Sequence, residues 1–309
     1  MVSADYAVQA VKGIKKSFDN AVQNKLEVYM DNRVIDFYNT SEISEIFTST
    51  EGLDGAKKLT ELETPPSLKL EDGYSVTLTE ERFGGAVVVP EGTYSRGVGD
   101  TSLKVKDFIM RQRNQLMKSN VQLLITNAFL MYNEAFDSTS DYLAPDGVEL
   151  CGAHTWNSGD TFDNSDTAAL DTDAVDDAVE AGADFEDASG KPMPINYDTI
   201  LVKKGSAAFR TAKKLFAEGI TPTAVNDINI YEGEFTIVAT PYITTANKAY
   251  WFMLDSNLDR SVAVGIGQAP MLHAPIIESN QAVRSNITGF WKQGILNMPF
   301  DVYGSDGTV

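Results

Sequence analysis

The segment from Leu103 to Phe136 constrains the fold most, because it contains neither Gly nor Pro and keeps a helical rhythm. At 1.5 Å per residue it predicts a helix of roughly 50 Å. A second apolar row joins the first only in the C-terminal half. The helix should therefore be amphipathic at its start and nearly buried at its end, as in a strut along which other elements pack. The first row recurs every three or four residues: Val105, Phe108, Gln112, Leu116, Asn120, Leu124, Ala128, Met131 and Ala135.

Charged side chains change from basic in the first half of this helix to acidic in the residues that follow. The first half carries Lys104, Lys106, Arg111, Arg113 and Lys118. The following residues, 119–190, contain 16 Asp or Glu and no Lys or Arg, and so account for most of the net charge of −19. Phosphate contacts need basic side chains, so the acidic region is not a nucleic-acid groove. We expect the basic helix end to face DNA or an acidic neighbour.

The length of 309 residues allows two domains or one elaborate domain. The sequence contains no run of about 18 apolar residues, so no membrane span is expected. The first 18 residues lack the apolar core of a signal peptide, so none is expected. Cys151 is the single cysteine, which excludes an intrachain disulfide and fits a reducing compartment.

The residues that precede the long helix predict an N-terminal arm followed by an extended β region. Residues 1–36 have partial helical periodicity and carry Lys12, Lys15 and Lys16, which form either a solvated face or an arm that reaches a neighbouring subunit. Alternation over 68–78 and a Val run at 87–89 predict two or three strands between Glu63 and Pro90. Asp72-Gly73 is interpreted as a turn, and Gly84-Gly85 as a break.

This β region has few large apolar side chains, and a two-stranded hairpin is marginal alone in water. It must therefore lie against its own domain or over another subunit. After the long helix, residues 167–182 predict an acidic helix with Gly182 as its C-cap. Further expected elements are a buried strand at 199–202, a helix at 206–217, and strands within 228–243, 250–254, 262–266, 276–277 and 290–303. Helices at the front and strands interrupted by helices behind indicate an α+β fold.

No catalytic constellation is apparent. Cys151 and His154 lack the further ligands that zinc needs, and a Cys–His nucleophilic pair is not favoured by their spacing. His273 lies in an apolar context typical of a structural histidine. Acidic pairs such as Asp171 and Asp173 do not fit a calcium loop. A pair of carboxylates for glycoside hydrolysis remains an open alternative, because whether two carboxylates lie close together depends on the tertiary structure. We expect no enzyme, cofactor or metal site.

The order of parts resembles the major capsid protein of tailed bacteriophages, with the HK97-like fold, and is most similar to the Mu-type major head subunit. The residues that carry this resemblance lie in four places: residues 74–84 with Val87-Val88-Val89 and Tyr94-Ser95-Arg96, residues 150–154 with Leu170, residues 191–195 through Leu201-Val202, and Gln268-Ala269-Pro270 with residues 290–303. His154 is followed by Thr155 where the family pattern has Pro. The chain also lacks a long charged coiled-coil extension, which implies separate scaffolding or a mature form.

The resemblance implies a domain division. Residues 1–45 would form an N-terminal arm, and 46–102 an extended β-hairpin loop with flanking strands. Residues 103–160 and 271–309 would form a peripheral domain with spine helix 103–136, and 161–270 an axial domain. It also implies inter-subunit contacts at these residues: Lys57, Lys58, Leu68, Leu70, Arg82, Arg111 and Arg113.

The implied function is a major capsid protein that assembles into pentamers and hexamers of an icosahedral shell enclosing phage DNA. Implied partners are its own copies, separate scaffolding, portal and decoration proteins, and packaged double-stranded DNA bound without sequence specificity. The implied localisation is the virion, with assembly in the host cytoplasm and no membrane. Two alternatives stay open: an encapsulin-like compartment shell, and a hydrolase that uses the acidic region.

Overall fold

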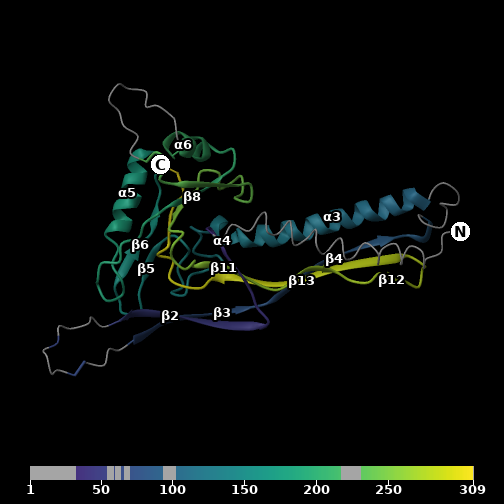
Figure 1. The fold of residues 1–309 in the computed structure, drawn as a ribbon, viewed down its shortest axis with the longest axis horizontal. Coiled ribbons are helices and arrows are strands. Elements are labelled where there is room, and N and C mark those ends of the chain that lie inside the picture. The colour runs from purple at the N-terminus through teal and green to yellow at the C-terminus, as the bar shows by residue number, and fades with distance from the viewer. Residues whose placement is uncertain are drawn as a thin grey trace.

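The computed structural model describes residues 33–53, 59, 64–65, 70–92, 102–216 and 231–308. The molecule has an elongated part, in which α3 (Ser102–Ala128) runs beside β4 (Glu81–Val89) and β13 (Val283–Ile295), and a body at one end of it (Figure 1). The expected arm up to residue 32 lies outside the described residues, as do Lys57, Lys58 and Leu68.

The elongated part is a five-stranded sheet, here called the ribbon sheet, with α3 along one face. Its order is β1 (Asp36–Asn39), β11 (Val262–Leu272), β13 and β12 (Ile276–Ile277), and β4 pairs with the other side of β13. β1 and β11 are parallel, and the other pairs are antiparallel. β13 is the spine of this sheet because three strands pair with it.

The body is built on a second sheet, here called the central sheet. Its order is β7 (Ser165–Asp166), β14 (Val302–Ser305), β10 (Trp251–Leu254), β8 (Thr199–Lys203) and β9 (Thr236–Thr240). Every residue of β10 is buried, as the continuous apolar run at 250–254 predicts for a central strand. Helices α5 (Thr172–Ala183) and α6 (Ala207–Phe216) pack into one apolar cluster with one face of this sheet.

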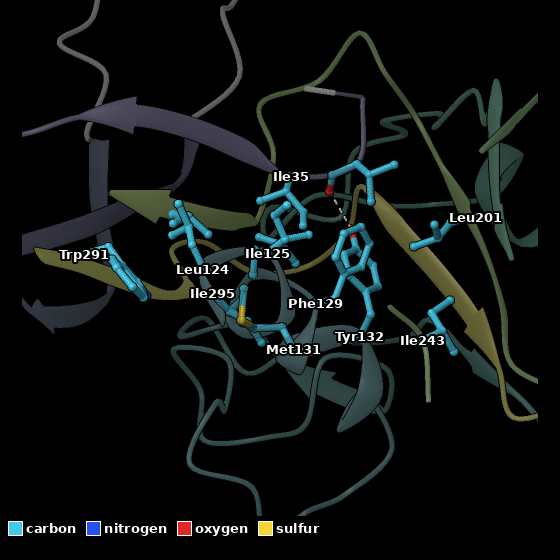
Figure 2. Close-up of a cluster of buried hydrophobic side chains, with 14 of the residues drawn as sticks. Ile35, Leu124, Ile125, Phe129, Met131, Tyr132, Leu201, Ile243, Trp291 and Ile295 are labelled. Carbon is cyan, nitrogen blue, oxygen red and sulfur yellow. Dashed lines mark hydrogen bonds between the residues drawn. The ribbon is translucent and has the colours of Figure 1, made fainter. Parts of the chain in front are cut away.

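The C-terminal end of α3 joins the two sheets. After Ala128 the chain continues through the short helix α4 (Leu130–Asn133). Tyr132 and Phe136 pack on Phe252 of the central sheet, while Ile125 and Trp291 lie in the same core (Figure 2). The hydroxyl of buried Tyr132 donates a 2.6 Å hydrogen bond to Val34 O. Burial therefore increases as expected from Arg111 to the end of the helix, whereas the side chains of residues 103–110 lie outside the described residues.

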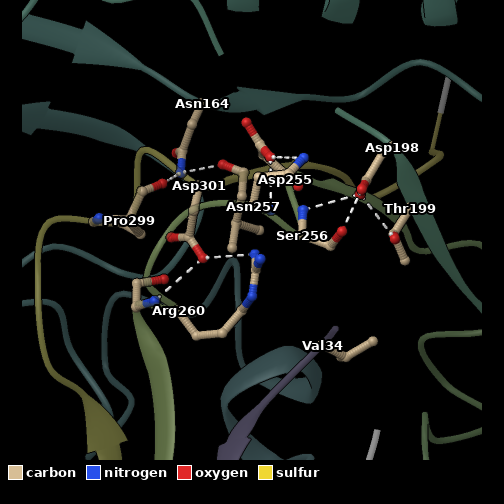
Figure 3. A network of polar contacts seen from close by, with 12 residues as sticks. Val34, Asn164, Asp198, Thr199, Asp255, Ser256, Asn257, Arg260, Pro299 and Asp301 are labelled. Carbon is tan, nitrogen blue, oxygen red and sulfur yellow. Dashed lines mark hydrogen bonds and ion pairs between the residues drawn. The ribbon is translucent and has the colours of Figure 1, made fainter. Parts of the chain in front are cut away.

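Polar side chains secure the loops between the two sheets (Figure 3). The amide of buried Asn164 donates to Pro299 O at 2.8 Å and to Val302 O at 2.9 Å. Asp301 is 3.5 Å from Arg260 and accepts from Ser261 N at 3.1 Å. Burial raises the pKa of Asp301 despite these partners. The network joins the loop before β14 to the loop between β10 and β11.

Two hairpins complete the described fold. β5 (Ala153–Thr155) pairs with β6 (Thr161–Asp163). β2 (Ser44–Leu53) pairs with β3 (Leu70–Thr79), and the two strands run below the body in Figure 1, on the side opposite α6. In the described residues, no helix is long and apolar enough to cross a membrane.

Four expectations about local structure are corrected. The long helix is α3 and then α4, separated at Phe129, and ends at Asn133 rather than at residue 136. Asp72-Gly73 is not a turn. It lies within β3, at an irregularity in the pairing with β2 where β3 carries one extra residue. Gly84-Gly85 does not break the chain, because β4 runs through it. Gly182 is not the C-cap but lies inside α5, where a Cβ would approach Ile195 O to 2.9 Å.

The sheets also cross the expected domain boundaries. β11 falls within the expected axial segment but pairs with β13 in the ribbon sheet. β14 falls within the expected peripheral segment but pairs with β10 in the central sheet. β4 falls within the expected loop segment and also belongs to the ribbon sheet. Pairing between strands that are not neighbours in the local pattern decides these memberships, and periodicity carries no information about it.

Candidate functional site

The hairpin β2–β3 presents one face to the protein and one to solvent. Alternate residues Glu45, Phe47 and Ser49 are at least partly buried, whereas Ser44, Ile46 and Thr48 are exposed. Ile46 is 71 % exposed, and so is Ile43 just before the strand. Exposed large apolar side chains on a projecting strand mark an interaction surface when they gather with others.

The inward face of the hairpin anchors it at two places. Leu78 packs with Ala263 and Leu296. A Cβ at Gly294 would lie 2.5 Å from Leu78 Cδ2, so any other residue would displace the Leu78 side chain from this contact. Further along, Tyr74 packs against an aromatic cluster that includes Trp156 and Phe300. The hairpin is therefore fixed along its base and its direction is defined.

A buried lysine fastens the point where the chain leaves the ribbon sheet and enters the hairpin. The Lys292 side chain on β13 is fully buried, and its Nζ lies 2.9 Å from Glu45 Oε2. The same Nζ donates to Glu42 O at 2.9 Å, and Tyr38 OH donates to Glu45 at 3.0 Å. Burial opposes the charge of Glu45, but hydrogen bonds from Thr40, Lys292 and Tyr38 prevail and lower its pKa. We call this group the Lys292 clasp.

A groove of about 620 Å³ lies on the ribbon sheet between β4, β13 and β12. Gly84 and Ala86 lie along it, with Arg82 toward one end and Arg284 toward the other. Arg82 lies over the ring of Phe290, 5.8 Å from its centroid. The groove is open to solvent in the single chain and is basic.

The expected contact residues are separated in the structure. Arg82 is exposed at the groove, and Arg111 is exposed on α3. Leu70 begins β3 and pairs with Leu53. Arg113 is only 1 % exposed, so the expectation of an exposed basic side chain is wrong for it. It lies on the face of α3 that continues to Met117 and Asn120, which are buried as well.

The candidate chemistry of Cys151 and His154 is not supported by their surroundings. Cys151 is buried, and burial raises the pKa of its thiol well above its ordinary value, which disfavours the reactive thiolate. His154 is fully buried, with Nδ1 3.0 Å from Asp146 Oδ2 and its ring stacked on Phe162. In the part of the chain that the structure describes, no group of three or more His, Cys, Asp or Glu could hold a metal ion.

Sequence reasoning missed the Lys292 clasp and the exposed Ile46. A lysine directly after Phe290-Trp291 in a predicted strand was a usable signal, because a cation among apolar neighbours needs a partner. Ile46 carried no such signal. Alternation predicts which residues share a face, but not which face stays uncovered.

The two sheets, the helix along the ribbon sheet and the β2–β3 hairpin have the arrangement of the HK97-like capsid fold, as expected from the sequence. Among solved structures, the capsid of an empty GTA particle is similar with a TM-score of 0.51 and 9% identity, over 89% of this chain and 90% of that one. The head of Helicobacter pylori bacteriophage KHP40 is similar with a TM-score of 0.49 and 11% identity, over 88% of each chain.

A virus-like particle from Pyrococcus furiosus is also similar, with a TM-score of 0.47 and 10% identity over 94% of this chain and 98% of that one. No family model and no curated protein matches the sequence. The likeness therefore lies in the three-dimensional arrangement, and at these identities it defines the fold alone.

Proposed function

We propose that this chain is the major capsid protein of a tailed phage, and that its copies form pentamers and hexamers of an icosahedral shell around DNA. The observation that carries the proposal is the uncovered face of the β2–β3 hairpin on a capsid-type fold. The outward face of this hairpin has no covering element in the described residues, and Ile46 lies on it with 71 % exposure. A second copy is the partner that would cover it.

The residues of β1 and the ribbon sheet would belong to the peripheral domain, and the central sheet with α5 and α6 to the axial domain. Copies would meet through the hairpin, with Leu70 at its distal part, and through the exposed Arg82 and Arg111. Separate scaffolding, portal and decoration proteins would complete the particle in the host cytoplasm. The Mu-type subclass remains a prediction from sequence.

Negative-stain microscopy of the expressed protein tests the proposal. Closed shells or rings are expected, and a monodisperse monomer with hydrolytic turnover would contradict it. Ile46→Asp should give a folded protein that no longer assembles, because it places a charge on the hairpin surface that a neighbour would cover. Ile46→Val keeps the branched apolar side chain and should assemble as the wild type does. If both variants assembled, the hairpin would not be part of the interface between copies.

A further inference from the structure

The two helices of the central sheet carry opposite charges. Asp173, Asp177 and Glu180 of α5 and its C-cap Asp184 follow one another at spacings of four, three and four residues, which places them on one stripe along the helix. All four are exposed. Val179, the exposed apolar residue of this helix, is 36 % exposed beside the stripe. This surface is here called the α5 stripe.

The matching surface on α6 is basic. Arg210, Lys213 and Lys214 are exposed and lie three and four residues apart, so they share one face. Residues 203–216 contain five Lys or Arg and no acidic residue. Lys213 Nζ lies 4.9 Å from the ring centroid of Phe209, so its stem covers a partly exposed aromatic surface. This surface is here called the α6 face.

The fold keeps the two surfaces apart within one chain. The start of α5 is tied to β10 and β14, since Trp251 Nε1 donates to Ala168 O at 3.0 Å and Ser305 Oγ donates to it at 2.6 Å. Helix α6 packs on the same face of the sheet, but on β8 and β9 at the other end of the strand order. Among the described residues, no ion pair joins an acid of the α5 stripe to a cation of the α6 face. Within the described residues, both charged surfaces are left open to solvent or to another molecule.

We propose that the α5 stripe of one copy docks on the α6 face of the next copy around a ring. This inference rests on the proposed shell function and names the contact between neighbours. Complementary potentials select the partner and suppress like-charge contacts. A two-fold contact would bring α5 against α5, acid against acid. The charge pattern therefore requires a head-to-tail contact, which closes into rings.

Paired charge reversals test the contact. Lys213→Glu with Lys214→Glu makes the α6 face acidic, and Asp177→Lys with Glu180→Lys makes the α5 stripe basic. At low salt, each pair should raise the protein concentration for half-maximal assembly by about tenfold or more, because like charges now face each other. The variant that carries all four substitutions should assemble at nearly the wild-type concentration.

Mixing the two pairs gives a sharper readout. At the concentration at which the wild type is half assembled, neither variant should assemble alone, but an equal mixture should alternate the two kinds around a ring. A five-membered ring cannot alternate two kinds, so native mass spectrometry should find even-membered rings only. Odd-membered rings in the mixture, or no rescue by mixing, would overturn the proposed contact.

Lys248→Glu is the matched control for the single substitution Lys213→Glu, because Lys248 is exposed and lies outside the two helices. It changes the net charge as Lys213→Glu does and should assemble normally. Equal loss in this control would assign the effect to net charge and overturn the inference. Asp177→Asn with Glu180→Gln leaves the helix uncharged at these sites and should weaken assembly less than reversal does. If the wild type itself formed no rings, the proposed function would fail instead.

Discussion

At the scale of single residues, Lys292 shows how the fold uses a buried charge. An ammonium group removed from water is costly unless it is paired and hydrogen-bonded. Here it contacts Glu45 and Glu42 O, two groups of the segment that leads from β1 into β2. Because an unpaired buried ammonium group is costly, the placement of the hairpin that pairs Lys292 with Glu45 and Glu42 O is strongly preferred over others.

Replacing Lys292 by Met should lower the free energy of unfolding by about 2 kcal/mol at pH 7, because Glu45 and Glu42 O lose their donor in a partly buried site. Urea denaturation followed by fluorescence measures this. Lys118→Met, at an exposed position of α3, should change stability little. A Lys292→Met protein as stable as the wild type would show that the clasp contributes no net stability.

The same comparison has a defined pH dependence. The pKa of Glu45 is lowered in the folded protein, so the clasp stabilises above its ordinary value of about 4.5 and loses this effect as the pH falls through the lowered value. The difference between wild type and Lys292→Met should therefore shrink in acid. A difference that stayed constant down to pH 3 would exclude Glu45 as the partner that matters.

At the scale of elements, two glycines let α3 and β13 approach β4. A Cβ at Gly84 would lie 2.6 Å from Ile287 O, a backbone atom, whereas a Cβ at Gly85 would meet the terminal Cδ1 of Leu116 at 3.1 Å. Gly84→Ala should therefore destabilise by about 1–3 kcal/mol, since the strand pair must shift. Gly85→Ala should cost much less, because a leucine methyl can move. Urea midpoints of the two variants should differ clearly, and equal midpoints would contradict the argument.

These glycines also show what the sequence could and could not predict. Alternation over 74–78 and the apolar run at 250–254 predicted strands β3 and β10 correctly. Gly84-Gly85 suggested a break, because glycine marks both chain turns and close approaches of elements. Only the position of α3 distinguishes the two. The burial of Arg113 and the pairing of β14 with β10 depend on contacts across the whole chain, which a local pattern does not contain.

At the scale of the whole molecule, stability should be distributed unevenly. β10 is wholly buried between β8 and β14, whereas β2 and β3 pair with each other and leave one face to solvent. Hydrogen exchange of the unassembled protein should be slowest at β10 and much faster at Glu45–Phe47 and Ser75–Thr77. After assembly these hairpin amides should become protected. A hairpin as protected as β10 before assembly would contradict the idea that neighbours stabilise it.

The Lys292 clasp lies at the near end of a long lever. A strand of ten residues, such as β2, spans about 33 Å. A rotation of roughly 5° at its base would carry the far end by about 3 Å over that length. Small adjustments around one ammonium group thus become changes of more than half a strand spacing, about 4.8 Å, at the far end of β2. In the proposed shell, one subunit would in this way meet neighbours across differently curved parts without altering either sheet.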